Sequence, residues 1–391
     1  MSKIESVKVF YFRYPFPDHI NYVYSGGKVE NMDLALIKVT DENGEYGLGE
    51  VTHGQFCYEP VVGMVKHFNQ LLVGHEISKI NRAWEIMYQS SIFWNRQGLG
   101  IGVMGGIDIA LHDLYAKQIG IPVYQLLGGL TRSHTRIYAS NGLFDTYEPL
   151  IEDALKAYGL GFRAYKMRVT NPDNAVLLVD KLFHEMKGKI DIIVDAVQGS
   201  CATPWSVNIS KKLGKELEKY NILWFEEPVR VENIDGYLEV KNHCNINIAG
   251  AESLPTADSF RQYIEKNTFD VVQFDFATTG FTEGRKIANL CSIYQKPLAI
   301  HSWGSIISIL SGIHMSLVTN NCAYTEYGFM DQPFNEYLSN KEYTIDNGVF
   351  SSNQLGPGLG VSYNSKIEEM YPYDSKSKNT MISFDESYLE L

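Results

Sequence analysis

The feature that most constrains the fold of this chain is a series of short apolar segments that recurs from residue 136 onward. Charged side chains stand at or next to the ends of seven segments, and successive ends are 23 to 31 residues apart. One β-strand followed by one α-helix has this length, so the series predicts eight βα units closed into a parallel barrel. An open doubly wound sheet is the alternative, but no Gly-rich phosphate loop follows the first strand. The segments are 136–140, 164–169, 191–195, 222–226, 246–252, 270–275, 297–301 and 323–326.

The first 130 residues have a different pattern, which is typical of an α+β unit with strands first and helices after. Apolar residues at 107, 110, 111 and 114 follow helical spacing, and Gly120 and Pro122 close that helix. Residues 15–32, rich in Tyr, Asn, Gly and Pro, predict a long mobile loop. The expected strands are 3–14, 34–39 and 46–50.

These patterns divide the 391 residues into three parts. We expect a capping domain over residues 1–130 and a barrel domain over residues 131–340. The tail, residues 341–391, contains turn signals and is expected to return to the capping domain.

The charge balance excludes several classes of partner. The chain has 34 Lys and Arg against 46 Asp and Glu, a formal charge of −12, and no basic run, so we expect neither nucleic-acid nor membrane binding. No stretch approaches the ~20 apolar residues of a membrane span, and the first residues lack the apolar core of a signal peptide. Five widely spaced cysteines without a CxxC indicate neither a disulfide framework nor a cysteine zinc site. A cytoplasmic protein is expected.

Three carboxylates end three successive predicted strands: Asp195, Glu226 and Glu252. Adjacent strands lie about 4.8 Å apart, so inward-pointing carboxylates at these ends can converge on one cation. Hard oxygen ligands without Cys or His suit Mg²⁺. Each acid taken singly could instead cap the helix that follows it, but three in consecutive units favour a Mg²⁺ site.

A second pair of residues predicts acid–base chemistry. Asp275 ends the next strand and His301 ends the one after it. A carboxylate bonded to one imidazole nitrogen fixes the tautomer and leaves the other nitrogen as a base. A lone histidine after an apolar strand is usually a buried core residue, but this one opens a loop, which favours the catalytic interpretation.

Two cations and a further acid complete the predicted catalytic and substrate-binding set. Lys166 and Arg168 are two residues apart on one strand, so both face the barrel interior and need anionic partners, either the carboxylates or an anionic substrate. Glu326 ends the last strand, where it could exchange a proton with a developing oxyanion. Tyr24 and His53 lie in N-terminal loops expected to overhang the barrel mouth, where they either bind substrate or pack on the surface.

Together these motifs resemble the enolase superfamily, in particular its mandelate racemase subgroup. The resemblance runs through nearly the whole chain, including residues 105–113, 122–129 and 224–228 and the final Glu326. It implies a modified (β/α)7β barrel beneath an α+β capping domain and a symmetric homo-oligomer. It also implies Mg²⁺ on Asp195, Glu226 and Glu252.

The resemblance further implies that an Asp275–His301 dyad removes the proton α to a carboxylate. Many relatives carry Lys-x-Lys on the second strand, where the second Lys is the opposite base, but this chain has Arg168 there. Arginine stays protonated, so racemisation lacks its second base. A second departure is Val197, where relatives often have Asn.

The sequence therefore favours a Mg²⁺-dependent dehydratase of an acid sugar. His301 would take the C2 proton, the C3 hydroxyl would leave, and a 2-keto-3-deoxy acid would form. Lys166 would neutralise charge, and Glu326 would hydrogen-bond the substrate carboxylate. One alternative is a racemase, epimerase or cycloisomerase of the same superfamily, with Lys166 as a candidate base. The other is a non-catalytic metal-binding barrel.

Overall fold

The structure is a computed structural model, and it describes residues 2–16, 22–24, 27–329 and 332–375. The side chains of residues 22–24, 27 and 28 are outside this description. Within these ranges, no helix is both long and apolar enough to cross a membrane.

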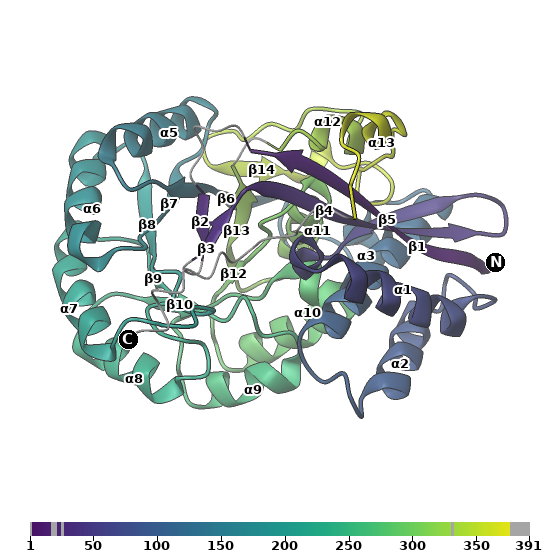
Figure 1. Cartoon of the computed structure of the whole chain (residues 1–391), viewed down its shortest axis with the longest axis horizontal. Coiled ribbons are helices and arrows are strands. Elements are labelled where there is room, and N and C mark those ends of the chain that lie inside the picture. Colours follow the sequence, from purple (N-terminus) through teal and green to yellow (C-terminus); the bar gives the residue numbers. More distant parts are fainter. Residues whose placement is uncertain (1, 17–21, 25–26, 330–331, 376–391) are drawn as a thin grey trace.

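Eight parallel strands close into a barrel, because the last of them pairs with the first (Figure 1). Each predicted apolar segment contains or overlaps one strand, so the predicted barrel is confirmed. The strands are β6 (His134–Leu143), β7 (Ala164–Arg168), β8 (Asp191–Asp195), β9 (Phe225–Glu226), β10 (Ile248–Gly250), β11 (Val271–Val272), β12 (Leu298–Ile300) and β13 (Cys322–Gly328).

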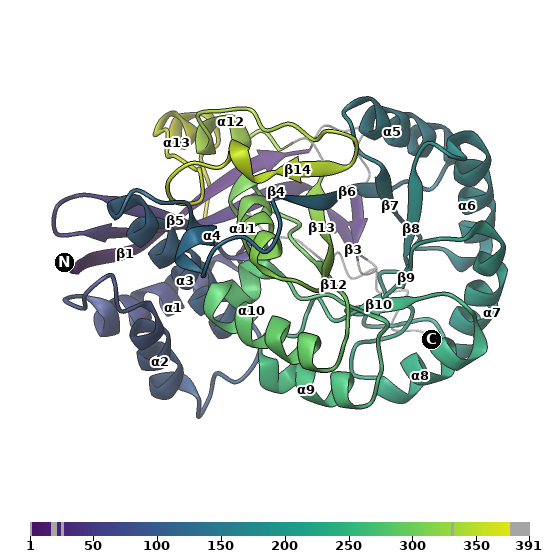
Figure 2. The ribbon, with the colours of Figure 1, turned by 180° about the vertical axis from the view of Figure 1, so that it is seen from behind.

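Seven helices join these eight strands and form a ring around the barrel, the (β/α)7β arrangement that the resemblance implies (Figure 2). Their apolar faces pack on the strands in one continuous core. The helices are α5 (Tyr147–Gly159), α6 (Pro172–Met186), α7 (Val207–Leu217), α8 (Ile234–His243), α9 (Ala257–Glu265), α10 (Phe276–Ile293) and α11 (Ile306–Val318).

A three-stranded antiparallel sheet and three helices form the α+β cap beside the barrel (Figure 1). A second apolar core lies between this sheet and its helices. The strands are β1 (Ile4–Pro15), β4 (Asn31–Asp41) and β5 (Tyr46–Glu50), followed by η1 (Thr52–Phe56), α1 (Tyr58–Leu72), α2 (Ile80–Ser91) and α3 (Leu99–Gln118).

The prediction of a loop over residues 15–32 is wrong in part. β2 (Tyr22–Tyr24) pairs with β3 (Gly27–Val29) as a two-stranded antiparallel sheet, and β4 begins at Asn31. Tyr and Val favour extended backbone, and here they outweigh the turn tendency of the neighbouring Gly, Asn and Pro.

The C-terminal part contacts both the barrel and the cap. β14 (Val349–Ser351) pairs antiparallel with β6, and α13 (Lys366–Met370) lies beside the cap (Figure 1). Beyond α13, Pro372 forms a bridge with Phe12 of β1. Two short helices, α4 (Val123–Leu126) and α12 (Asn335–Leu338), and two 3₁₀ helices, η2 (Glu218–Tyr220) and η3 (Ser352–Gln354), complete the described elements. The domain limits at residues 130 and 340 stay a prediction.

The segment 105–113 lies in α3, where the cap meets the barrel. Helix α10 contains a kink at Gly280, whose φ of 63° is in the left-handed region. Asp108 accepts hydrogen bonds from the N–H groups of Phe281 (2.7 Å) and Thr282 (2.9 Å), so a cap carboxylate satisfies the donors that the kink exposes. A Cβ atom at Gly105 would lie 2.2 Å from a carbonyl oxygen of α10, so only glycine allows this close approach.

A second carboxylate of the cap, Glu50 at the end of β5, contacts the first turn of α11. It accepts hydrogen bonds from the backbone N–H (3.1 Å) and the hydroxyl (2.5 Å) of Ser305. Burial nevertheless raises the pKa of Glu50 to about 7, because the hydrogen bonds only partly offset the loss of water. The ionised form is thus disfavoured in the folded protein.

This raised pKa predicts that Glu50 lowers stability as the pH rises from about 4.5 to about 7. The folded state holds the proton more tightly than the unfolded chain in that window, so deprotonation favours unfolding. Relative to the wild type, Glu50→Gln should gain about 2 kcal/mol of unfolding free energy between pH 5 and pH 8. Urea titrations at several pH values measure this difference, and a pH-independent difference would contradict it.

Candidate active site

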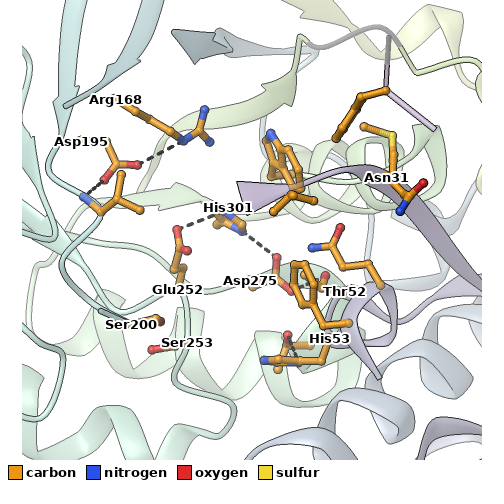
Figure 3. A pocket seen from close by; sticks show the side chains of 18 residues that line it. Asn31, Thr52, His53, Arg168, Asp195, Ser200, Glu252, Ser253, Asp275 and His301 are labelled. Carbon is orange, nitrogen blue, oxygen red and sulfur yellow. Dashed lines mark hydrogen bonds and ion pairs between the residues drawn. The ribbon is translucent and has the colours of Figure 1, made fainter. Parts of the chain in front are cut away.

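A cavity of about 290 Å³ lies at the carboxyl ends of the barrel strands, with residues of the cap forming part of its wall (Figure 3). Lys166, Glu226 and Glu326 are fully buried and are not part of the wall. The side chain of Tyr24 is outside the described part of the chain. Six predicted site residues line the cavity: His53, Arg168, Asp195, Glu252, Asp275 and His301.

The predicted dyad is formed at the ends of two adjacent strands. Asp275 follows β11 and His301 follows β12, and a parallel bridge joins the two residues. His301 Nδ1 lies 2.6 Å from Asp275 Oδ2, and its Nε2 lies 3.1 Å from Glu252 Oε2 and 3.3 Å from Glu326 Oε2. Asp275 therefore orients the imidazole so that Nε2 points toward the acids of the site.

Electrostatics favour the protonated form of His301. Burial opposes its charge, but Glu252, Glu326 and Asp275 outweigh burial and raise the pKa of His301 to about 10. The pKa of Glu326 is lowered to about 2, because His301, Lys166 and Arg168 outweigh its burial. Positive charge added among these carboxylates would favour the neutral, basic imidazole.

The three predicted metal ligands stand at the ends of neighbouring strands. Asp195 ends β8 and pairs with Glu226 of β9, and Glu252 follows β10. Burial, together with the charge of Glu226, raises the pKa of Asp195 to about 7. Among the described residues, no three His, Cys, Asp or Glu side chains are arranged to hold a metal. Glu226 instead contacts Lys166, and Glu252 contacts His301.

None of the three acids caps the helix that follows it. Each of α7, α8 and α9 begins with a polar side chain that accepts a hydrogen bond from the first turn. The helix-capping alternative is therefore wrong for all three carboxylates. The capping residues are Ser206, Asn233 and Thr256.

The backbone beside each of these acids adopts a costly conformation. Val197 has a φ of 54°, Glu227 a φ of 43° and Ala251 a φ of 90°, in the region that favours glycine. Each lies within two residues of Asp195, Glu226 or Glu252. Such conformations cost of order 1–3 kcal/mol each and concentrate at functional sites. Their placement supports a functional role for the three strand ends.

Lys166 lies at the floor of the site among three carboxylates. Its Nζ is 2.6 Å from Glu226 Oε1, 3.0 Å from Glu326 Oε1 and 3.4 Å from Asp195 Oδ2. Burial lowers its pKa, but the charges of Glu226 and Glu326 outweigh burial and hold the pKa well above its usual value. Lys166 is thus a cation in this arrangement, which does not favour it as a base.

Arg168 is held in the cavity wall by several contacts. Its guanidinium donates to the backbone oxygen of Asn141 (2.5 Å) and the hydroxyl of Ser140 (3.0 Å). Its Nε lies 3.7 Å from Asp195 Oδ2, and its guanidinium carbon lies 6.0 Å from the ring centre of Trp303. These contacts present a fixed positive charge to the cavity.

His53, from η1 of the cap, also lines the cavity. Its Nδ1 is 3.4 Å from the hydroxyl of Thr278. Burial lowers its pKa, so the neutral imidazole is favoured near pH 7. Substrate binding by His53 stays a prediction.

Several residues that support the site were not among those predicted from the sequence. Trp224 Nε1 and Gln273 Nε2 each donate to Glu226 Oε2 over 2.9 Å. Strand alternation could have found both, because Trp224 is two residues before Glu226 and Gln273 two before Asp275. Thr52, which contacts Asp275, has no local sequence signal.

The chain matches two protein families along most of its length. Residues 6–128 match the mandelate racemase / muconate lactonizing enzyme N-terminal domain. Residues 149–367 match the enolase C-terminal domain-like family.

Curated relatives and a solved structure agree with these matches. A D-gluconate/D-galactonate dehydratase from Picrophilus torridus is 26% identical, with 87% of this chain and 89% of that protein covered. A D-mannonate dehydratase from Caulobacter vibrioides is 24% identical, with 87% and 92% covered. The 3,6-anhydro-D-galactonate cycloisomerase from Zobellia galactanivorans superposes with a TM-score of 0.85 at 26% identity, covering 95% of this chain and 99% of that one.

The position of Lys166 predicts a large effect of its removal. Breaking a buried ion pair leaves uncompensated charge and costs about 3–5 kcal/mol. We expect Lys166→Met to lower the unfolding free energy by about this amount in urea titrations with EDTA. Lys211→Met, which removes a partly exposed pair with Glu239, is the matched control and should cost under about 1 kcal/mol. Equal losses for the two variants would contradict the burial argument.

Proposed function

This chain is a member of the mandelate racemase and muconate lactonizing enzyme family of the enolase superfamily, and from that membership we propose that it is a Mg²⁺-dependent sugar-acid dehydratase. The observation that carries the proposal is the Asp275–His301 pair facing a cavity that Arg168 also lines, at the sequence position where the family resemblance implies a second base. One base and one fixed cation suit proton removal followed by elimination, and they suit racemisation poorly.

The residues at the strand ends fit a Mg²⁺ ion in their chemistry. Asp195, Glu226 and Glu252 supply hard oxygen donors from adjacent strands, and they do not cap helices. Members of the superfamily generally bind Mg²⁺. When bound, the ion would act as a Lewis acid toward the substrate carboxylate.

His301 is the base in this proposal. In its neutral form, Nε2 takes the proton from C2 of the substrate, while Asp275 holds the Nδ1–H and stabilises the imidazolium that forms. The buried ammonium of Lys166 and the guanidinium of Arg168 favour the negative charge that develops on the substrate carboxylate.

The protonated His301 is then the best-placed acid for the second step. Glu326 is held in its ionised form by the neighbouring cations, so it accepts hydrogen bonds and does not donate a proton. The proton on Nε2 passes to the C3 hydroxyl, the C3–O bond breaks and water leaves. The enol that remains tautomerises to a 2-keto-3-deoxy acid.

The relatives named as dehydratases support this reaction class. The structural neighbour named as a cycloisomerase supports a second candidate, which is a cycloisomerase acting on a sugar acid. Both reactions fit a carboxylate substrate beside one base, so the fate of the C3 substituent distinguishes them.

We expect the Mg²⁺-loaded protein to convert at least one member of a panel of C4 to C6 sugar mono- and diacids into a keto acid. The measurement is a keto-acid assay combined with NMR in D₂O, which follows exchange at C2 and loss of the C3 hydroxyl. Exchange with inversion or ring closure, without loss of water, would contradict the dehydratase proposal.

The matched control for this screen is His301→Asn. It removes the base while leaving Asp195, Glu226 and Glu252 in place, so turnover should fall by at least about 10²-fold. Calorimetry should show that Mg²⁺ still binds. Turnover retained in this variant would remove His301 from the mechanism.

A further inference from the structure

The carboxylate of Asp275 has a second partner, and that partner comes from the cap. Thr52 Oγ1 donates to Asp275 Oδ1 over 2.9 Å, while Oδ2 contacts His301 Nδ1 over 2.6 Å. Figure 3 shows the contacts as a chain from the cap through Asp275 to the imidazole. The carboxylate of Asp275 therefore links the cap to the barrel, and Thr52 and Asp275 are 223 positions apart in sequence.

We propose that Thr52 is a positioning residue, which fixes the orientation of the Asp275 carboxylate and through it the direction of His301 Nε2. The proposal deepens the proposed function and rests on it for its catalytic consequence. In this role Thr52 does not contact the reacting atoms.

The physical reason is the rotational freedom of a carboxylate. The terminal torsion of an aspartate is broad, so a single hydrogen bond leaves the carboxylate plane free to turn. A second bond on the other oxygen restricts that rotation. Because the Nδ1–H of His301 points at Oδ2, restricting the carboxylate also restricts the imidazole plane and the position of Nε2.

The position of Thr52 is fixed by contacts of the cap with the barrel. Thr52 begins η1, two residues after Glu50, and Glu50 binds Ser305 at the start of α11. Ser305 is four residues after His301. One short segment of the cap thus contacts both the partner of the base and the loop that follows the base.

Thr52 also lines the cavity, so its hydroxyl could contact substrate instead. The two roles differ in kinetics. A positioning role lowers kcat with little change in KM, because the base is misaligned in the bound complex. A substrate contact made in the ground state raises KM.

The test uses the full-length, Mg²⁺-loaded protein and the substrate found in the panel. Thr52→Val keeps the side-chain shape and removes the hydroxyl, and the corresponding partners that orient metal-ligating side chains are worth about 10–100-fold in activity. We expect kcat to fall at least about 10-fold while KM changes less than about two-fold. Thr52→Ser restores the hydroxyl and should recover most of the loss.

Thr319→Val is the matched control. Thr319 is buried at the far end of α11 and donates to the Met315 oxygen over 2.7 Å, so this variant also loses one buried hydroxyl bond. It should lower stability without lowering kcat. An equal fall in kcat for the two valine variants would overturn the positioning role.

A second readout does not depend on the reaction. The Nδ1 proton of His301, assigned by its loss in His301→Asn, should resonate far downfield in the wild type because of its short bond to Asp275. In Thr52→Val it should move upfield or exchange faster, and Thr52→Ser should restore it. An unchanged resonance in Thr52→Val would overturn the proposal. If the resonance shifts in Thr52→Val but the panel yields no keto acid, the positioning role of Thr52 is supported and the dehydratase function is rejected.

Discussion

The ion pairs of one fully buried ammonium group determine the charge balance at the mouth of this barrel. Lys166 lies within 3.4 Å of carboxylate oxygens from Asp195, Glu226 and Glu326, which lie on three different strands. Without that cation, the acids at the strand ends would repel one another in a medium that screens charge poorly. With it, the barrel holds a surplus of negative charge near the cavity, which suits a divalent cation and an anionic substrate bound together.

The site is assembled where the cap meets the barrel. Asp108 of the cap satisfies the donors at the kink in α10, and Glu50 contacts the start of α11. Helix α10 begins directly after Asp275, and α11 begins five residues after His301. Contacts that dock the cap are therefore the same contacts that hold the two helices behind Asp275 and His301, so the packing of the cap and the orientation of the His301 imidazole are linked.

Much of the barrel was predictable because it depends on local regularities. The interval of 23 to 31 residues between strand ends follows from the length of a βα unit, and it placed Asp195, Glu226, Glu252, Asp275 and His301 on one edge. Contacts between distant segments were not predictable in this way. Thr52 reaches Asp275 across 223 residues, and no spacing rule connects them. The β2–β3 pairing was not predicted, because each strand has only three residues and turn-forming residues lie next to both.

The left-handed backbone at Val197 has a consequence for protein engineering. A β-branched residue is an outlier at a φ of 54°, whereas glycine or asparagine adopts that conformation at lower cost. A screen for thermostability alone would therefore favour exchanging Val197 for one of these residues. The same exchange would alter the cavity wall two residues from Asp195, whose carboxylate accepts a hydrogen bond from the Val197 N–H over 2.8 Å. Selection for heat resistance and selection for substrate preference would thus act on one side chain, and libraries at this position should be sorted for both properties together.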